Sequence, residues 1–187
     1  MAEKKTLSRH RARSILTAAT KRTVIVTGDG MLDQFIWGEV DRISPEAPVP
    51  VVQFKRESFM AGGAANVARN LTALGCYTQM HSVIGKDDAA KKLRSLLKAD
   101  RVDCHPLISD TSRQTSCKTR VIAQRQQVVR VDRETRIDIT PRLTKRLIKS
   151  INTSFGKSNA IVIGDYGKGV ITQDYLNELK TIGQRHG

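Results

Sequence analysis

The sequence is poor in aromatic residues and in cysteine. Phenylalanine, tryptophan and tyrosine make up 4% of its 187 residues, and the 3 cysteines are Cys76, Cys104 and Cys117. No two of them form a CxxC pair, and an odd, scattered set of thiols is typical of a reducing compartment rather than of a disulfide framework. No apolar run approaches the roughly 20 residues that span a bilayer, and no apolar stretch follows the basic N-terminus. We therefore predict a globular, cytoplasmic protein that does not enter the membrane.

Patterns for metal binding and for the common nucleotide loops are also missing. The 4 histidines are dispersed and match neither HExxH nor a zinc cluster, so the sequence predicts no metal site. Residues 28–33 begin like a dinucleotide fingerprint, but Asp33 stands where GxGxxG needs its third glycine. The turn at residues 167–169 lacks the upstream glycine and the Ser or Thr of a Walker A loop.

Positive charge is in excess and is concentrated at one end. There are 32 Lys and Arg against 18 Asp and Glu, a formal net charge of +14. Residues 1–23 hold seven of these cations against Glu3, and we set this range apart as a basic N-terminal tail. A basic surface can attract nucleic acid, anionic lipid or phosphorylated small molecules. A nucleic-acid module should also interleave aromatic with basic residues or carry a named motif. Neither is present, so nucleic acid is not predicted as a partner.

Strands and helices alternate along the rest of the chain. Apolar and β-branched runs predict strands at residues 23–28, 77–83 and 160–164. Apolar residues at helical spacing predict helices from Ala64 to a stop at Gly75, from Asp88, after Thr140-Pro141 and after Thr172. This alternation is typical of a mainly parallel sheet with helices on both faces. Strand pairs within residues 35–54 and 115–132 interrupt it and predict two hairpins that form a small second sheet.

Candidate ligand-binding residues follow the predicted strands. Ligands of an open parallel sheet bind beyond the carboxyl ends of its strands, where Asp33 occurs. Asp33 is either a turn or helix cap or an acceptor for sugar hydroxyls. Gly62 and Gly63 open a helix, so backbone N–H groups can approach a ligand without Cβ obstruction. Asn66 can both donate and accept hydrogen bonds, which suits a neutral polyol. An ordinary glycine turn at a helix start would have the same appearance.

This glycine and asparagine pattern resembles the first signature of a known family, the ribokinase-like carbohydrate kinases. Further segments resemble the branch of that family that phosphorylates D-glycero-β-D-manno-heptose 7-phosphate at C1 in ADP-heptose synthesis for the lipopolysaccharide core. The similarity runs from about Val24 to the end of the chain. The signature is Gly62-Gly63-Ala64-Ala65-Asn66-Val67-Ala68 followed by Gly75 and Gly85, and the further segments are residues 28–33, 42–52, 126–127, 130–132 and 165–169.

The resemblance implies a ribokinase-like α/β fold over residues 24–187, with residues 35–54 and 115–132 forming a β-hairpin lid. It also implies transfer of the γ-phosphoryl group of ATP, with Mg²⁺, to a sugar hydroxyl. Carried over by position, the implied substrate-binding residues fall into two groups. The sugar hydroxyls would be held by Asp33, Gly62, Gly63 and Asn66. The substrate phosphate would be met by Lys118 and Arg120, which lie on one face of a strand, and by Lys168. Asp165 would cap its turn or touch the sugar. Each of the three cations could instead be plain surface charge.

The resemblance covers the front part of the family's domain. The second signature of the family is a glycine-rich turn with the aspartate that acts as catalytic base, and it has no counterpart here. Most of the family's ATP pocket lies in the same later part of the domain as this second signature. We therefore expect the catalytic base downstream of Gly187, a truncated fold with an unpaired sheet edge, and negligible kinase activity from this chain alone. The expected partners are a second copy bound through the lid or a complementing C-terminal half. Two alternatives stay open: a ribokinase-like kinase for another sugar or a nucleoside, and a non-catalytic sugar-phosphate-binding or assembly module.

Overall fold

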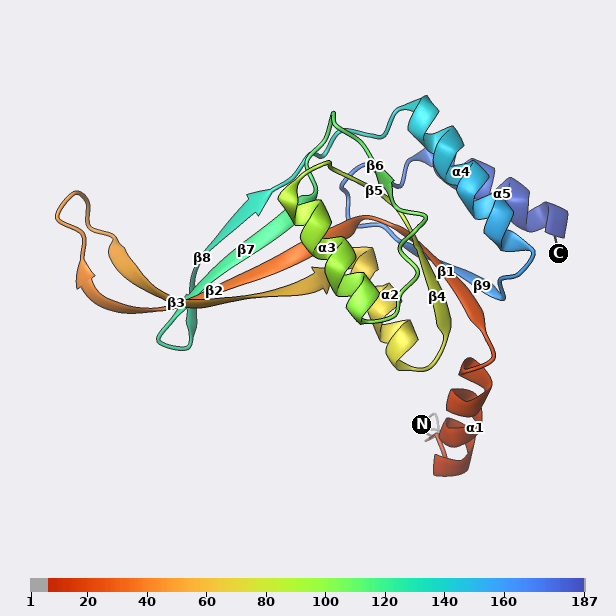
Figure 1. The fold of residues 1–187 in the computed structure, drawn as a ribbon, viewed down its shortest axis with the longest axis horizontal. Coiled ribbons are helices and arrows are strands. Elements are labelled where there is room, and N and C mark those ends of the chain that lie inside the picture. The colour runs from red at the N-terminus through yellow and green to blue at the C-terminus, as the bar shows by residue number, and fades with distance from the viewer. Residues whose placement is uncertain (1–6, 187) are drawn as a thin grey trace, which may run out of the picture.

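A three-stranded parallel sheet forms the centre of the molecule (Figure 1). The computed structural model describes residues 7–186. In the central sheet β1 (Thr23–Gly28) lies between β4 (Tyr77–His81) and β9 (Ala160–Gly164). All three strands were predicted, but the predicted strand over residues 77–83 is broken after His81. Beyond the break, β5 (Val83–Ile84) pairs with β6 (Ile108–Ser109) in a separate two-stranded sheet.

Helices cover both faces of this sheet, because the apolar side chains of β1 alternate between them. Val24 and Val26 pack in one core with α2 and α3, whereas Ile25 packs in the other with α4 and α5. The helices are α2 (Gly63–Ala73), α3 (Asp88–Ala99), α4 (Pro141–Phe155) and α5 (Gln173–His186). Thr140 caps α4 as predicted, and the side chain of Asp87 caps α3. The α/β fold prediction is confirmed.

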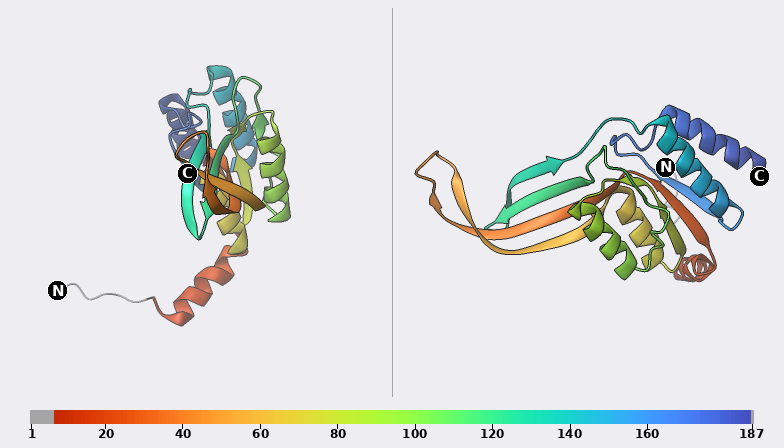
Figure 2. Two further views of the ribbon diagram at one scale, coloured as in Figure 1. Left: turned by 90° about the vertical axis from the view of Figure 1, so that its left-hand side faces the viewer. Right: turned by 45° about the horizontal axis from the view of Figure 1, so that its top comes forward.

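The second sheet projects from the body as a long ribbon (Figures 1 and 2). Its strand order is β3-β2-β7-β8, with antiparallel outer pairs and a parallel β2–β7 pair in the middle. The strands are β2 (Gly30–Ile43), β3 (Pro50–Gly62), β7 (Ser116–Ala123) and β8 (Gln126–Arg133). We call this sheet the lid. It contains both predicted hairpins, and its first two strands are longer than the sequence indicated.

A helix precedes the central sheet where the sequence indicated only a basic tail. α1 (Arg9–Ala19) is capped by the Ser8 side chain, and none of its residues is buried. It stands away from the body below the start of β1 (Figure 2). Residues 1–6 of the predicted tail lie outside the described residues. None of the helices over residues 7–186 is long and apolar enough to cross a membrane.

The outer edge of β9 pairs with no strand in the described part of the chain. Ile163 on this strand is 44% exposed. An apolar groove of about 310 Å³ runs beside it, lined by residues that include Ile161 of β9 and Leu176 and Leu179 of α5. The sheet is therefore open on this side, as the sequence predicted for a truncated fold.

Candidate functional site

The N-terminus of α2 meets the base of the lid at Asp33. Gly62 is the N-cap of α2, and a Cβ atom at this position would overlap the Asp33 carboxylate. Gly63 has a φ of +54°, and a Cβ there would overlap the main-chain carbonyl of Asp29. Only glycine fits both positions without strain. The two glycines therefore allow the Asp33 carboxylate to approach the helix N-terminus closely.

Asn66 lies on the first turn of α2, on the same side of the helix as Gly62. The two residues are four apart, which places them one above the other on an α-helix. Asn66 is half-buried, and its side chain forms no hydrogen bond to any residue that the structure describes. Its amide can therefore donate and accept toward a ligand held at this end of the helix, close to Asp33.

Charged side chains gather beside Asp33 on one face of the lid. Asp33 is the register partner of Lys118 on β7, which in turn is opposite Asp132 on β8. Arg120 Nη1 lies 2.5 Å from Asp33 Oδ1, and Lys118 Nζ lies 3.2 Å from Asp132 Oδ2. Arg130 also binds Asp132, with Nε 2.8 Å from Oδ1. The hydrogen bonds from Arg130 and Lys118 lower the pKa of Asp132 below its ordinary value.

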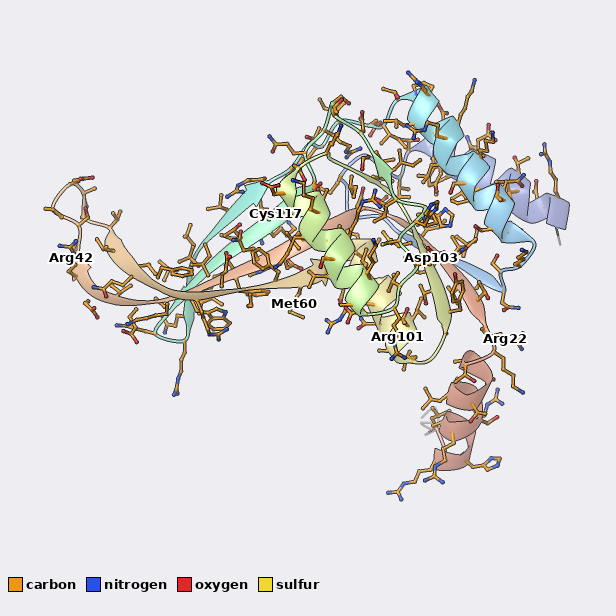
Figure 3. All side chains as sticks on the ribbon, viewed as in Figure 1. Arg22, Arg42, Met60, Arg101, Asp103 and Cys117 are labelled. Carbon is orange, nitrogen blue, oxygen red and sulfur yellow. The ribbon has the colours of Figure 1, made fainter. Side chains whose placement is uncertain are left out.

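The opposite face of the lid is closed at its base. Leu32 and Cys117, which alternate with Asp33 and Lys118, are buried in the core that contains α2 and α3. Burial raises the pKa of the Cys117 thiol. Figure 3 shows Met60, the register partner of Asp33, near the body and Arg42 toward the far end of the ribbon. The charged cluster thus lies where the lid joins the body.

Lys168 and Asp165 make contacts of their own in the loop after β9. Lys168 is 8% exposed, and its Nζ lies 2.8 Å from Glu134 Oε2. This contact lowers the pKa of Glu134. Asp165 is exposed, and its Oδ1 accepts a hydrogen bond of 2.9 Å from the Gly167 N–H, so it caps its turn. Phosphate binding by Lys168 and sugar binding by Asp165 stay predictions.

Sequence reasoning missed the residue that organises this loop. Asp29 is 1% exposed, and its carboxylate accepts backbone N–H bonds from Tyr166, Lys168 and Val170 at 2.8, 3.1 and 3.1 Å. The buried Arg113 donates to the Lys168 carbonyl at 2.6 Å, and burial lowers the pKa of Arg113. An aspartate directly after the glycine that ends a buried strand was the available signal for Asp29, because such a carboxylate must find donors in a neighbouring loop.

Six of the eight predicted site residues come together at the base of the lid. Asp33, Gly62, Gly63 and Asn66 surround the N-terminus of α2, and Lys118 and Arg120 lie beside Asp33. Arg130 and Asp132 join them, although sequence reasoning gave these two no role. Over residues 7–186 no three His, Cys, Asp or Glu side chains are placed to hold a metal ion. The arrangement places hydrogen-bond acceptors and cationic side chains side by side at one end of α2.

A mainly parallel sheet covered by helices on both faces and extended by a strand lid defines a ribokinase-like α/β protein. Residues 21–187 match the pfkB family of carbohydrate kinases, and the chain belongs to that family.

Individual relatives agree with this assignment. The chain is 43% identical over 173 residues to the bifunctional protein HldE of Geobacter sulfurreducens and 42% identical over 181 residues to that of Geotalea uraniireducens. The matches cover 92% and 97% of this chain but only 35% and 37% of those proteins. A solved carbohydrate kinase from Agrobacterium tumefaciens superimposes with a TM-score of 0.66 at 19% identity, over 88% of this chain and 51% of that one. The chain thus spans about a third of the curated relatives and half of the solved kinase.

Proposed function

We propose that this chain forms the sugar-phosphate-binding part of an ATP-dependent kinase. The proposed substrate is D-glycero-β-D-manno-heptose 7-phosphate, which would be phosphorylated at C1 to the 1,7-bisphosphate in ADP-heptose synthesis. One observation carries the proposal: groups suited to hydroxyls and groups suited to a phosphate lie side by side at the base of the lid. Family membership and the heptose-kinase resemblance of the flanking segments support it.

The chemistry of each group matches one part of a sugar phosphate. The Asp33 carboxylate accepts hydrogen bonds from hydroxyls, and the Asn66 amide accepts one and donates another. Lys118 and Arg120 supply the positive charge that a phosphate dianion needs, and arginine can bind two phosphate oxygens at once. Adjacent strands are about 4.8 Å apart, so Asp33 on β2 and Lys118 on β7 can contact different parts of one small ligand.

Phosphoryl transfer depends on positioning and on electrostatic stabilisation of the transferred group. The lid would close over the sugar and exclude water, which otherwise competes as the acceptor. The catalytic base and most of the ATP pocket of the family lie outside the part that this sequence resembles. We therefore propose that the 187 residues alone have negligible kinase activity and require a complementing C-terminal half.

Isothermal titration calorimetry with a panel of sugars tests the substrate. Heptose 7-phosphate should bind the chain more tightly than fructose 6-phosphate, ribose or a nucleoside. Asn66→Ala should weaken binding at least tenfold, whereas Asn70→Ala, an exposed asparagine one turn further along α2, should leave it unchanged. Tighter binding of another sugar phosphate would favour a different kinase specificity. Equal affinities of wild type and Asn66→Ala would reject the site.

A further inference from the structure

The carboxylate proposed to bind sugar hydroxyls already has a charged partner. Arg120 Nη1 lies 2.5 Å from Asp33 Oδ1, and the two side chains are 24% and 22% exposed. Both are therefore partly withdrawn from water, which strengthens the attraction between them. A hydroxyl that binds Asp33 Oδ1 has to compete with a guanidinium, which is the stronger donor, whereas Oδ2 faces the backbone at Gly62.

Arg120 itself lies in a cluster that has more positive than negative charge. Its register partner across β7 and β8 is Arg130, and like charges directly opposite each other destabilise a sheet. Arg130 is held by Asp132 through Nε and Nη2 at 2.8 and 3.0 Å, and Asp132 also holds Lys118. The three cations face two carboxylates, so a bound anion would complete the charge balance.

Arg120 also lies against an aromatic ring. Its guanidinium carbon lies 5.3 Å from the centroid of the Phe35 ring, its register neighbour on β2. Contact with an aromatic face stabilises a guanidinium without using its N–H donors. The side chain can therefore exchange its carboxylate partner for a phosphate while it remains next to the ring.

We propose that Arg120 couples recognition of the phosphate to recognition of the sugar hydroxyls. A phosphate placed among Lys118, Arg120 and Arg130 draws the guanidinium away from Asp33 and so frees the Asp33 carboxylate for hydroxyls. An unphosphorylated sugar lacks this means of breaking the ion pair and binds weakly. Arg120 is then a specificity-determining residue for phosphorylated sugars. The sugar half of this inference rests on the proposed function, but the competition between Asp33 and an anion for Arg120 does not.

Inorganic phosphate, titrated calorimetrically at constant ionic strength, tests that competition without any sugar. Asp33→Asn should bind phosphate about fivefold more tightly than wild type, because Arg120 no longer has to leave a carboxylate. Arg120→Gln should bind it several-fold more weakly. Arg133→Gln is the matched control, since Arg133 is an exposed arginine on the opposite face of β8, and it should behave like wild type.

The double variant separates competition from a general change in charge. In the Arg120→Gln background, Asp33→Asn should give no gain in phosphate affinity, because its effect acts through Arg120. An equal gain in both backgrounds would overturn the coupling, as would an Asp33→Asn variant that binds phosphate no better than wild type. Thermal melts of each variant establish that it is folded before its affinity is compared.

Sugar binding gives the second readout. Wild type should bind heptose 7-phosphate at least a hundredfold more tightly than the unphosphorylated heptose. Arg120→Gln should weaken binding of the phosphate ester and leave binding of the free heptose equal or tighter, because Asp33 is then unpaired. Parallel losses for both sugars would overturn the coupling. If wild type binds neither sugar, the proposed function fails, whereas the phosphate titrations still decide whether Asp33 and an anion compete for Arg120.

Discussion

A single buried carboxylate holds the loop after β9 in place. Asp29 accepts three backbone N–H bonds from that loop, and the residue is 1% exposed. Asp29→Asn removes the charge and converts one acceptor oxygen into a donor that faces other donors. We expect a loss of about 2–4 kcal/mol in the free energy of unfolding, measured by urea denaturation. Asp165→Asn, at an exposed carboxylate with one loop hydrogen bond, should cost less than about 1 kcal/mol. Equal losses would contradict the role given to Asp29.

A buried histidine makes stability depend on pH. His81 is fully buried, its Nδ1 lies 3.2 Å from Ser150 Oγ, and its Nε2 has no partner among the described residues. Burial lowers its pKa from 6.5 to about 4, an effect that nearby Asp103 only partly offsets. Between these two values the unfolded chain binds the proton and the folded chain does not.

The stability that His81 contributes should therefore be fully present above pH 6.5 and decline as the pH falls to about 4. The free energy of unfolding should fall by about 3 kcal/mol over this range, and His81 should cause no further change below about pH 4. Urea denaturation across this range measures it. His81→Gln should flatten the profile, whereas His105→Gln, at an exposed histidine, should not. An unchanged profile in His81→Gln would assign the pH dependence to other groups.

The start of α2 depends on two glycines for different reasons. A methyl group at Gly62 overlaps the Asp33 carboxylate, whereas at Gly63 it overlaps backbone and requires an unfavourable positive φ. Gly63→Ala should therefore lower the free energy of unfolding by about 1–3 kcal/mol. Gly62→Ala should mainly weaken ligand binding, because the Asp33 side chain must move. Gly183→Ala in α5, with open space around it, should stabilise the chain by about 0.5–1 kcal/mol. Calorimetry and thermal melts measure both effects, and identical behaviour of all three variants would refute this distinction.

The elements that sequence reasoning found are those whose signal is local. The apolar run of β1, the Thr140-Pro141 start of α4 and the Gly75 stop after α2 are each determined by neighbouring residues. The full length of β2 was not visible, because residues 30–34 are specified by pairing with β3 and β7 rather than by their own pattern. α1 was missed because its arginines were interpreted as part of a basic tail, although Ala12, Ile15, Leu16 and Ala19 recur at helical spacing.

In the site, too, features specified by neighbouring residues were predicted and features specified by distant residues were not. The glycine pair and Asn66 form a contiguous motif, so their place at one helix end followed from the sequence. The Asp33–Arg120 ion pair joins residues 87 positions apart, and only the parallel pairing of β2 with β7 brings them together. The role of Asp29 depends on donors 137 to 141 positions away in the chain. The ion pair therefore has no local signature. For Asp29, its place after a buried strand indicated that the carboxylate needs donors, but not which loop supplies them.

At the scale of the whole molecule, the open edge of β9 offers a surface with which another chain could pair. Unpaired strand edges beside apolar grooves favour pairing with another chain. We expect the chain to self-associate in sedimentation velocity experiments at micromolar concentrations. Ile163→Lys, at a position 44% exposed on β9, should shift it toward monomer without unfolding it. Val131→Lys, at an exposed apolar position of the lid, is the comparison variant. A shift with Val131→Lys alone would place the contact on the lid.

The position of α1 outside the body has a practical consequence for handling the protein. Arg9, Arg11, Arg13, Lys21 and Arg22 all precede β1, and none of them is buried. Backbone that lacks tertiary packing opens most easily to a protease. Brief trypsin treatment should therefore cut first in the early part of α1, after Arg9, Arg11 or Arg13, because Arg22 and Thr23 are hydrogen-bonded to Tyr77 and Asn159 at the start of the sheet. An affinity tag fused to the N-terminus would be lost in the same cut.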